Sequence, residues 1–145
     1  MSEQITLKFT VSATDYSVPL GLRVSLDSAV FYENAGVDSE TQIQHQLSDD
    51  DGEHELTFEL FGKQPEHTKI DDAGNIVSDA MLAVSEIEID EIDIDQLVQS
   101  YTVYHHEFNG TKPLTQDRFY GHMGCNGTVK LKFTTPIYLW LLENM

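Results

Sequence analysis

The fold class is decided by one stretch, His54-Glu-Leu-Thr-Phe-Glu-Leu-Phe61. Its apolar side chains Leu56, Phe58 and Leu60 alternate with polar ones, so they fall on one face of an extended chain. Alternation with a period of two is typical of a strand that has one buried face. The stretch therefore predicts a β-strand that packs against a core.

The same alternation recurs along the whole chain. The apolar positions that follow it elsewhere are Ile5, Leu7, Phe9, Val11, Leu22, Val24, Leu26, Ile43, Leu47, Val129, Leu131 and Phe133. Turn-forming residues separate these segments, and no long amphipathic helix interrupts them. About eight to ten short strands of this kind predict an all-β protein, an antiparallel β-sandwich of jelly-roll type that spans residues 1–145 as one domain.

The alternation changes phase between residues 82 and 94. The apolar positions follow each other as Leu82 and Val84, then Ile87 and Ile89, then Ile92 and Ile94. A strand can keep the same face buried through such a change only by adding a residue. We therefore expect a β-bulge or a bend at each change.

Further along, Tyr101, Val103 and His105 alternate and predict a strand with these three side chains on one face. Asn126-Gly127 is the preferred pair for a type I′ turn, so we expect a hairpin there. The tail from Ile137 to Leu142 is apolar throughout and is expected to form a core strand or an interface segment, with Trp140 in the core.

The charge of the chain restricts its partners. Eight Lys and Arg residues stand against 25 Asp and Glu residues, a net charge of −17, and the pI is about 4.4. Nucleic acids and anionic membranes need a cationic face and are disfavoured as partners. Cations, neutral sugars and basic protein surfaces remain, as does acidity that serves only solubility in a salty milieu.

The N-terminus has no basic and apolar leader, and no run approaches the roughly 18 apolar residues of a membrane span. We expect the chain to be cytoplasmic as made, with release in a virion as an alternative.

Oxygen-bearing side chains gather in and after the long loop that begins at Gly62. They are Asp71, Asp72, Asn75 and Asp79. Ca²⁺ takes about six to eight oxygen ligands, and carboxylates are its preferred side-chain ligands. These residues therefore predict a Ca²⁺ site, and the alternative is a set of solvated turns in an acidic chain.

Catalytic motifs are missing from the sequence. It contains no nucleophile elbow, phosphate-binding loop or zinc-binding histidine pair on a helix, so we expect a protein that is not an enzyme. Sugars are bound by flat aromatic faces together with polar groups. Tyr104 and Tyr120 have polar neighbours, and we predict that they are exposed and serve as ligand-binding platforms.

The order of these segments resembles calcium-dependent xylan-binding modules. In that family a strand like 54–61 leads to a loop bearing Asp residues and then to a strand like 78–89. The resemblance implies a non-catalytic β-sandwich in which Asp79, together with Asp71 or Asp72, binds Ca²⁺ that meets sugar hydroxyls. The sequence departs from the family pattern directly after Asp79, where Ala and Met replace Arg and Asn.

The compact acidic chain and its apolar tail are also similar to small proteins of marine bacteriophages. Two hypotheses follow. The first is a non-catalytic module that binds polysaccharide with Ca²⁺, and the alternative is a structural protein that assembles with other virion subunits or with copies of itself. An exposed apolar patch at 137–142 would favour assembly, whereas a tyrosine-lined groove beside an acidic loop would favour sugar.

Overall fold

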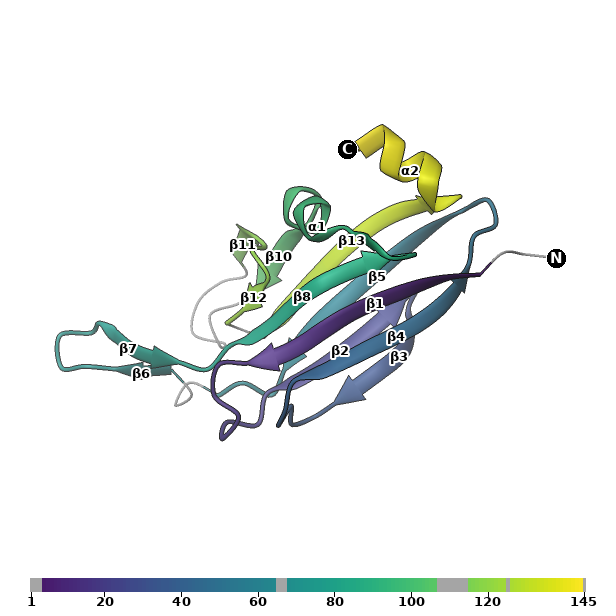
Figure 1. Cartoon of the computed structure of the whole chain (residues 1–145). Helices are drawn as coiled ribbons and strands as arrows, with labels where there is room; N and C mark the ends of the chain where they lie inside the picture. The colour runs from purple at the N-terminus through teal and green to yellow at the C-terminus, as the bar shows by residue number, and fades with distance from the viewer. Residues whose placement is uncertain (1–3, 65–67, 107–114, 125, 145) are drawn as a thin grey trace.

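The structure, a computed structural model, describes residues 4–64, 68–106, 115–124 and 126–144. Most of its strands form two antiparallel sheets that face each other, and one hairpin projects from the body (Figure 1). Sheet A contains β1 (Gln4–Ala13), β4 (Thr41–Ser48), β8 (Leu82–Ile89), β9 (Ile92–Asp93) and β12 (His122–Met123). Sheet B contains β2 (Gly21–Leu26), β3 (Ala29–Asn34), β5 (Gly52–Phe61), β10 (Val103–His106), β11 (Thr115–Arg118) and β13 (Gly127–Thr135). The projecting hairpin consists of β6 (Thr68–Ile70) and β7 (Ile76–Asp79), and the helices are α1 (Asp95–Tyr101) and α2 (Ile137–Asn144).

The strand order is β12-β8-β1-β4 in sheet A, with β9 paired to β8, and β11-β10-β13-β5-β2-β3 in sheet B. Two antiparallel sheets, with two short helices among the described residues, confirm the predicted all-β class. Jelly-roll connectivity stays a prediction. Neither helix in the described part of the chain is long and apolar enough to cross a membrane.

The core lies between the two sheets and consists largely of the alternating residues that the sequence singles out. Phe9 of β1 and Phe58 of β5 are fully buried and meet edge to face, with 5.3 Å between ring centroids. The inward positions of the central strand pair are Leu56, Phe58 and Leu60 on β5 and Val129, Leu131 and Phe133 on β13. The predicted burial of these strands is confirmed.

Strand β8 confirms the predicted change of phase. Its pairing with β1 shifts between Lys8 and Thr10, where β8 carries one residue more than β1. Glu86 lies at this bulge with a φ of 52°. The extra residue lets Val84 and Ile87 both face the core, although three positions separate them.

Two hairpins turn through pairs of residues with positive φ. Asp27 and Ser28 join β2 to β3 with φ values of 52° and 70°, and Asp90 and Glu91 join β8 to β9 with values of 52° and 69°. Positive φ at both central positions is the requirement of a type I′ turn, which usually contains Gly or Asn. Neither pair contains glycine or asparagine, so neither place carries a strong turn signal in the sequence.

The predicted strand around Val103 and His105 is β10, but it begins after Tyr101 and turns these two side chains to its outer face. Tyr101 ends α1, and the strand that follows buries Tyr104 and His106 rather than Val103 and His105. The register decides this, because Tyr104 pairs with the inward-facing Val129 of β13. Because Tyr101 lies in α1, its position does not predict which face of β10 is buried.

Asn126-Gly127 does not form the predicted hairpin turn. Gly127 is the first residue of β13, and β12 pairs with β8 instead of with β13. A Cβ atom on Gly127 would lie 2.2 Å from the carbonyl oxygen of His105, so close packing against β10 requires glycine here. The Asn126 amide exchanges hydrogen bonds of 2.9 Å with the backbone of Lys63.

The apolar tail forms helix α2 instead of a core strand. Pro136 separates this helix from β13. Ile137, Trp140 and Leu141 are buried, which matches the spacing of one helix face and confirms Trp140 as a core residue.

Candidate functional site

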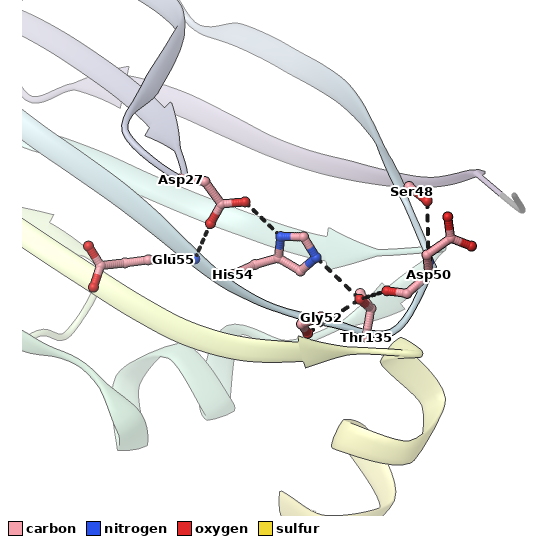
Figure 2. Close-up of polar contacts among 7 residues, drawn as sticks. All are labelled: Asp27, Ser48, Asp50, Gly52, His54, Glu55 and Thr135. Carbon is pink, nitrogen blue, oxygen red and sulfur yellow. Dashed lines mark hydrogen bonds and ion pairs between the residues drawn. The ribbon is translucent and has the colours of Figure 1, made fainter.

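Three distant segments meet around His54 near the α2 end of the sandwich. Figure 2 shows the imidazole between Asp27, from the β2–β3 turn, and Thr135, the last residue of β13. His54 Nδ1 lies 2.7 Å from Asp27 Oδ2, and His54 Nε2 lies 3.2 Å from Thr135 Oγ1. The Thr135 hydroxyl donates in turn to the carbonyl oxygen of Asp50, in the β4–β5 turn. We refer to Asp27, His54, Thr135 and the Asp50 carbonyl as the His54 network.

The carboxylate of Asp27 is fixed from two sides. Besides its contact with His54, Asp27 Oδ1 accepts a hydrogen bond of 2.8 Å from the Glu55 amide. Burial raises the pKa of Asp27, but the hydrogen bonds from His54 and from the Glu55 amide outweigh this effect, so the pKa lies below its ordinary value of 3.8. The network therefore holds a carboxylate that stays ionised.

The order carboxylate, imidazole and hydroxyl is the one used in nucleophilic catalysis. Two observations argue for a structural role instead. Thr135 is only 3% exposed. Its single hydroxyl proton is directed to the Asp50 carbonyl, so His54 does not receive it as a general base would. The network joins the β2–β3 turn, the β4–β5 turn and the end of β13.

Helix α2 begins directly beyond this network and is held by other side chains. Asp49 Oδ1 accepts a hydrogen bond of 2.8 Å from the Ile137 amide at the first turn. The Tyr138 hydroxyl donates to the Asp90 carboxylate in the β8–β9 turn. Tyr101 Oη lies 3.4 Å from the Asn144 carbonyl oxygen at the other end of the helix. Helix α2 is thus anchored at both ends.

The outer side of α2 is also apolar. Tyr138, Leu139 and Leu142 are 49%, 58% and 78% exposed, respectively. We refer to these three residues as the apolar α2 face. A helix that carries large apolar side chains both toward the core and toward solvent is unusual for a surface helix, which normally has a polar outer side.

A groove of about 480 Å³ runs beside this face. Its lining residues are Asp51, Gly52, Glu53, Thr134, Thr135, Pro136, Leu139 and Glu143. We refer to it as the acidic groove, since three of its side chains are carboxylates. Leu139 belongs both to the groove and to the apolar α2 face, so the two surfaces are continuous.

The predicted calcium residues lie at two ends of the projecting hairpin. Asp71, Asp72 and Asn75 are exposed at its tip. Asp71 Oδ1 accepts hydrogen bonds from the Asn75 and Ala73 amides, 2.9 and 3.0 Å long, and these lower the pKa of this carboxyl. The structure thus brings Asp71 and Asn75 together, in a turn.

Asp79 is separate from the other predicted calcium ligands. It pairs with Thr68 at the base of the hairpin, and its carboxylate accepts a hydrogen bond from the buried ammonium group of Lys63. The same ammonium donates to the Gly124 carbonyl. Among the residues that the structure describes, no group of three or more His, Cys, Asp or Glu side chains is arranged to hold a metal ion.

The two predicted tyrosine platforms have different environments. Tyr104 is 6% exposed and packs against His106, with 4.4 Å between ring centroids, so the prediction that it lies on the surface is wrong. Tyr120 is exposed as predicted, and the Arg118 guanidinium lies 5.3 Å from the centre of its ring. It borders a small depression of about 210 Å³, whose lining carries one carboxylate, that of Asp95.

Sequence reasoning missed a second groove, on the outer side of sheet B. It has a volume of about 550 Å³ and is lined by Glu55, Tyr101, Val103, His105, Lys130, Lys132, Trp140 and Asn144. Tyr101 is exposed there. The alternation of Lys130 and Lys132 with inward-facing residues was the available signal for this outer face.

Comparison of the chain with protein-family models, with curated protein sequences and with solved structures finds no match.

Proposed function

We propose that this protein is a non-catalytic module that assembles with another protein subunit through the apolar α2 face. The observation that carries the proposal is the exposure of Tyr138, Leu139 and Leu142 on a helix that is anchored at both ends. Full burial of one such side chain contributes about 1.5–3 kcal/mol to association. A partner that covers this face would remove the three side chains from water without first having to order the helix.

The structure also bears on the choice between assembly and sugar binding. An exposed apolar patch at 137–142 is the feature expected of an assembly protein, and half of that segment forms such a patch. Of the two tyrosines expected to bind sugar, Tyr104 lies inside the core, and Tyr120 borders a small depression whose lining carries one carboxylate, that of Asp95. A virion subunit is one partner of this kind, in keeping with the resemblance to bacteriophage proteins.

Site-specific photo-crosslinking tests the proposal. A photoreactive p-benzoylphenylalanine is placed at Leu142 and, in a separate protein, at the exposed control position Val30 of β3. On irradiation in the native host, the Leu142 protein is expected to form one discrete adduct that mass spectrometry identifies and that Leu139→Asp abolishes. Absence of a discrete adduct, or the same products from both positions, would contradict the proposal.

The groove on the outer side of sheet B favours polysaccharide binding as a second candidate function. Exposed Tyr101 supplies an aromatic face, and Lys130, Lys132 and Asn144 supply hydrogen-bond donors around it. The single tryptophan, Trp140, lines the groove and would report an occupant by fluorescence. A xylan oligosaccharide is expected to change this emission in the wild type and not in Tyr101→Ala. No change in the wild type would remove the candidate.

Calcium remains a proposal tied to the sugar hypothesis. A Ca²⁺ ion that binds only the folded chain raises the midpoint of thermal unfolding. The expected result is a rise in millimolar Ca²⁺ over EDTA that Mg²⁺ does not reproduce and that Asp71→Asn reduces. An equal rise with any salt would mean that Asp71, Asp72, Asn75 and Asp79 form solvated turns and an internal ion pair.

A further inference from the structure

We propose that the apolar α2 face and the acidic groove together dock a basic amphipathic segment of the partner protein. The inference rests on the proposed assembly function and adds the chemistry of the partner. Such a segment would place leucine-like side chains on Leu139 and Leu142 while its lysine or arginine side chains enter the groove.

The acidic groove is negatively charged. In the part of the chain that the structure describes, none of the carboxylates of Asp51, Glu53 and Glu143 takes part in an ion pair. Elsewhere, acidic side chains of sheet B such as Glu55 and Glu59 have cationic neighbours. The groove is thus a concave surface with unneutralised negative charge, and it selects for cations.

The apolar α2 face and the acidic groove form one continuous surface. Leu139 and Pro136 line the groove together with the carboxylates, so apolar and acidic groups lie side by side. A free cation would neutralise the carboxylates but leave the apolar side chains exposed to water. A neutral apolar partner would cover the apolar side chains but leave the carboxylates without a cation. A segment with alternating basic and apolar side chains satisfies both parts.

Hydrogen bonds hold both walls of the acidic groove in place. One wall follows the β4–β5 turn, where the Asp50 carbonyl accepts from Thr135, and the other is α2, whose first amide donates to Asp49. Figure 2 shows the turn and the start of the helix close together at Thr135. Both walls are therefore in place before binding, and this lowers the entropic cost of docking.

A second copy of this chain does not fit the same surface. Each copy has a net charge of −17, so pairing two acidic grooves would bring like charges together. An anionic membrane is disfavoured for the same reason. The occupant is a different, basic protein.

A labelled synthetic helix of lysine and leucine tests the inference by fluorescence anisotropy against the full chain. A helix in which serine replaces every lysine is the control probe. The lysine helix is expected to bind the wild type more tightly than the serine helix. The combined change Glu53→Gln and Glu143→Gln is expected to weaken binding by about tenfold, since two charge contacts are lost.

Matched variants separate docking from general attraction to an acidic protein. Asp38→Asn combined with Glu40→Gln removes the same charge from exposed positions outside the groove, and Val30→Ser removes an exposed apolar side chain from β3. Both are expected to bind the lysine helix as the wild type does, whereas Leu139→Ser weakens binding. Equal losses in the two acidic double variants, or equal binding of both probes, would overturn the inference.

The two proposals can fail separately. If the Leu142 crosslinker captures a discrete protein whose crosslinked segment is not basic, the assembly function stands and the inference fails. If the lysine helix binds as expected but the crosslinker captures nothing discrete, the surface has the inferred chemistry and the assembly function fails. Circular dichroism of every variant establishes that it is folded.

Discussion

The outer side of sheet B and the α2 end of the molecule both carry acidic side chains, but the two regions differ in whether cations neutralise them. On sheet B, Arg23 lies between Glu33 and Glu59, with contacts of 2.6 and 2.8 Å, and its guanidinium lies 4.8 Å from the centre of the Phe61 ring. In the acidic groove, no cation of the described chain pairs with the carboxylates.

The difference is informative because cations are scarce in this chain. Only eight Lys and Arg residues are available for 25 acidic ones, so any pairing leaves most carboxylates without a partner. The acidic groove differs from other unpaired carboxylates in that its three carboxylates lie beside the exposed Leu139 of the apolar α2 face. This combination is what distinguishes the α2 end as a surface for a basic partner.

The largest effect is expected from Lys63, the cation that is buried among the described residues. Lys63→Met leaves the Asp79 carboxylate half-buried without its ammonium partner and is expected to lower the free energy of unfolding by about 3 kcal/mol. Chemical denaturation measures this. Lys130→Met, which removes an exposed ion pair of 3.8 Å with Glu55, is the control and should lose less than about 1 kcal/mol. Similar losses in both variants would show that the position of a cation in this fold has little effect.

A smaller effect is expected at the wall of the groove. Thr135→Val keeps the shape of the side chain but removes the hydroxyl that contacts His54 and Asp50, which should cost about 1–2 kcal/mol of unfolding free energy. Hydrogen exchange should rise in the β4–β5 turn, and the affinity for the lysine helix should fall with it. Thr128→Val, near the other end of β13 and outside the acidic groove, is the control. Unchanged exchange in the turn would mean that the His54 network does not hold the groove in shape.

A pH titration separates the buried part of the α2 end from its exposed part. The pKa of Asp27 is lowered in the folded state, so its contribution to stability is complete above the ordinary value of 3.8 and is lost as the pH falls below that value through the folded pKa. Asp27→Asn is therefore expected to flatten the loss of stability in this acid range. Glu40→Asn, at an exposed position, serves as the comparison variant. An acid transition of the same steepness in Asp27→Asn and the wild type would contradict the role of Asp27.

The smallest effects test the comparison itself. Arg23→Gln is expected to destabilise the protein slightly at low ionic strength, because two favourable contacts are lost. Glu53→Gln with Glu143→Gln is expected to stabilise it slightly, because like charges are removed from one groove. Thermal unfolding at low and high salt measures both, and salt should reduce both shifts toward zero. Shifts of the same sign would mean that the two surfaces do not differ in how their carboxylates are neutralised.

The parts of the fold that alternation encodes could be predicted from the sequence. The phase change between Val84 and Ile87 predicts the bulge at Glu86, since a strand records its buried face directly in its spacing. Tyr104 could not be placed in the same way. Its phase depends on where α1 ends and on the register with Val129, and neither is local to the strand.

The candidate site was less accessible to sequence reasoning. His54 lies 27 positions from Asp27 and 81 from Thr135, so no local pattern connects them. The tail at 137–142 is apolar throughout, and such a run does not show which residues will be buried or whether it forms a strand or a helix. Lys63, the partner of Asp79, was also missed, because a lysine in a polar loop gives no sign in the sequence that it will be buried.

The turn at Asp27 has a consequence for how this chain can evolve. A type I′ turn is satisfied best by glycine or asparagine, so drift toward either residue would ease the backbone at this position. Glycine, however, has no carboxylate to hold His54, and asparagine would present a neutral amide in its place. Aspartate at this position thus combines a backbone conformation that glycine or asparagine would adopt more easily with the carboxylate that holds His54 in place.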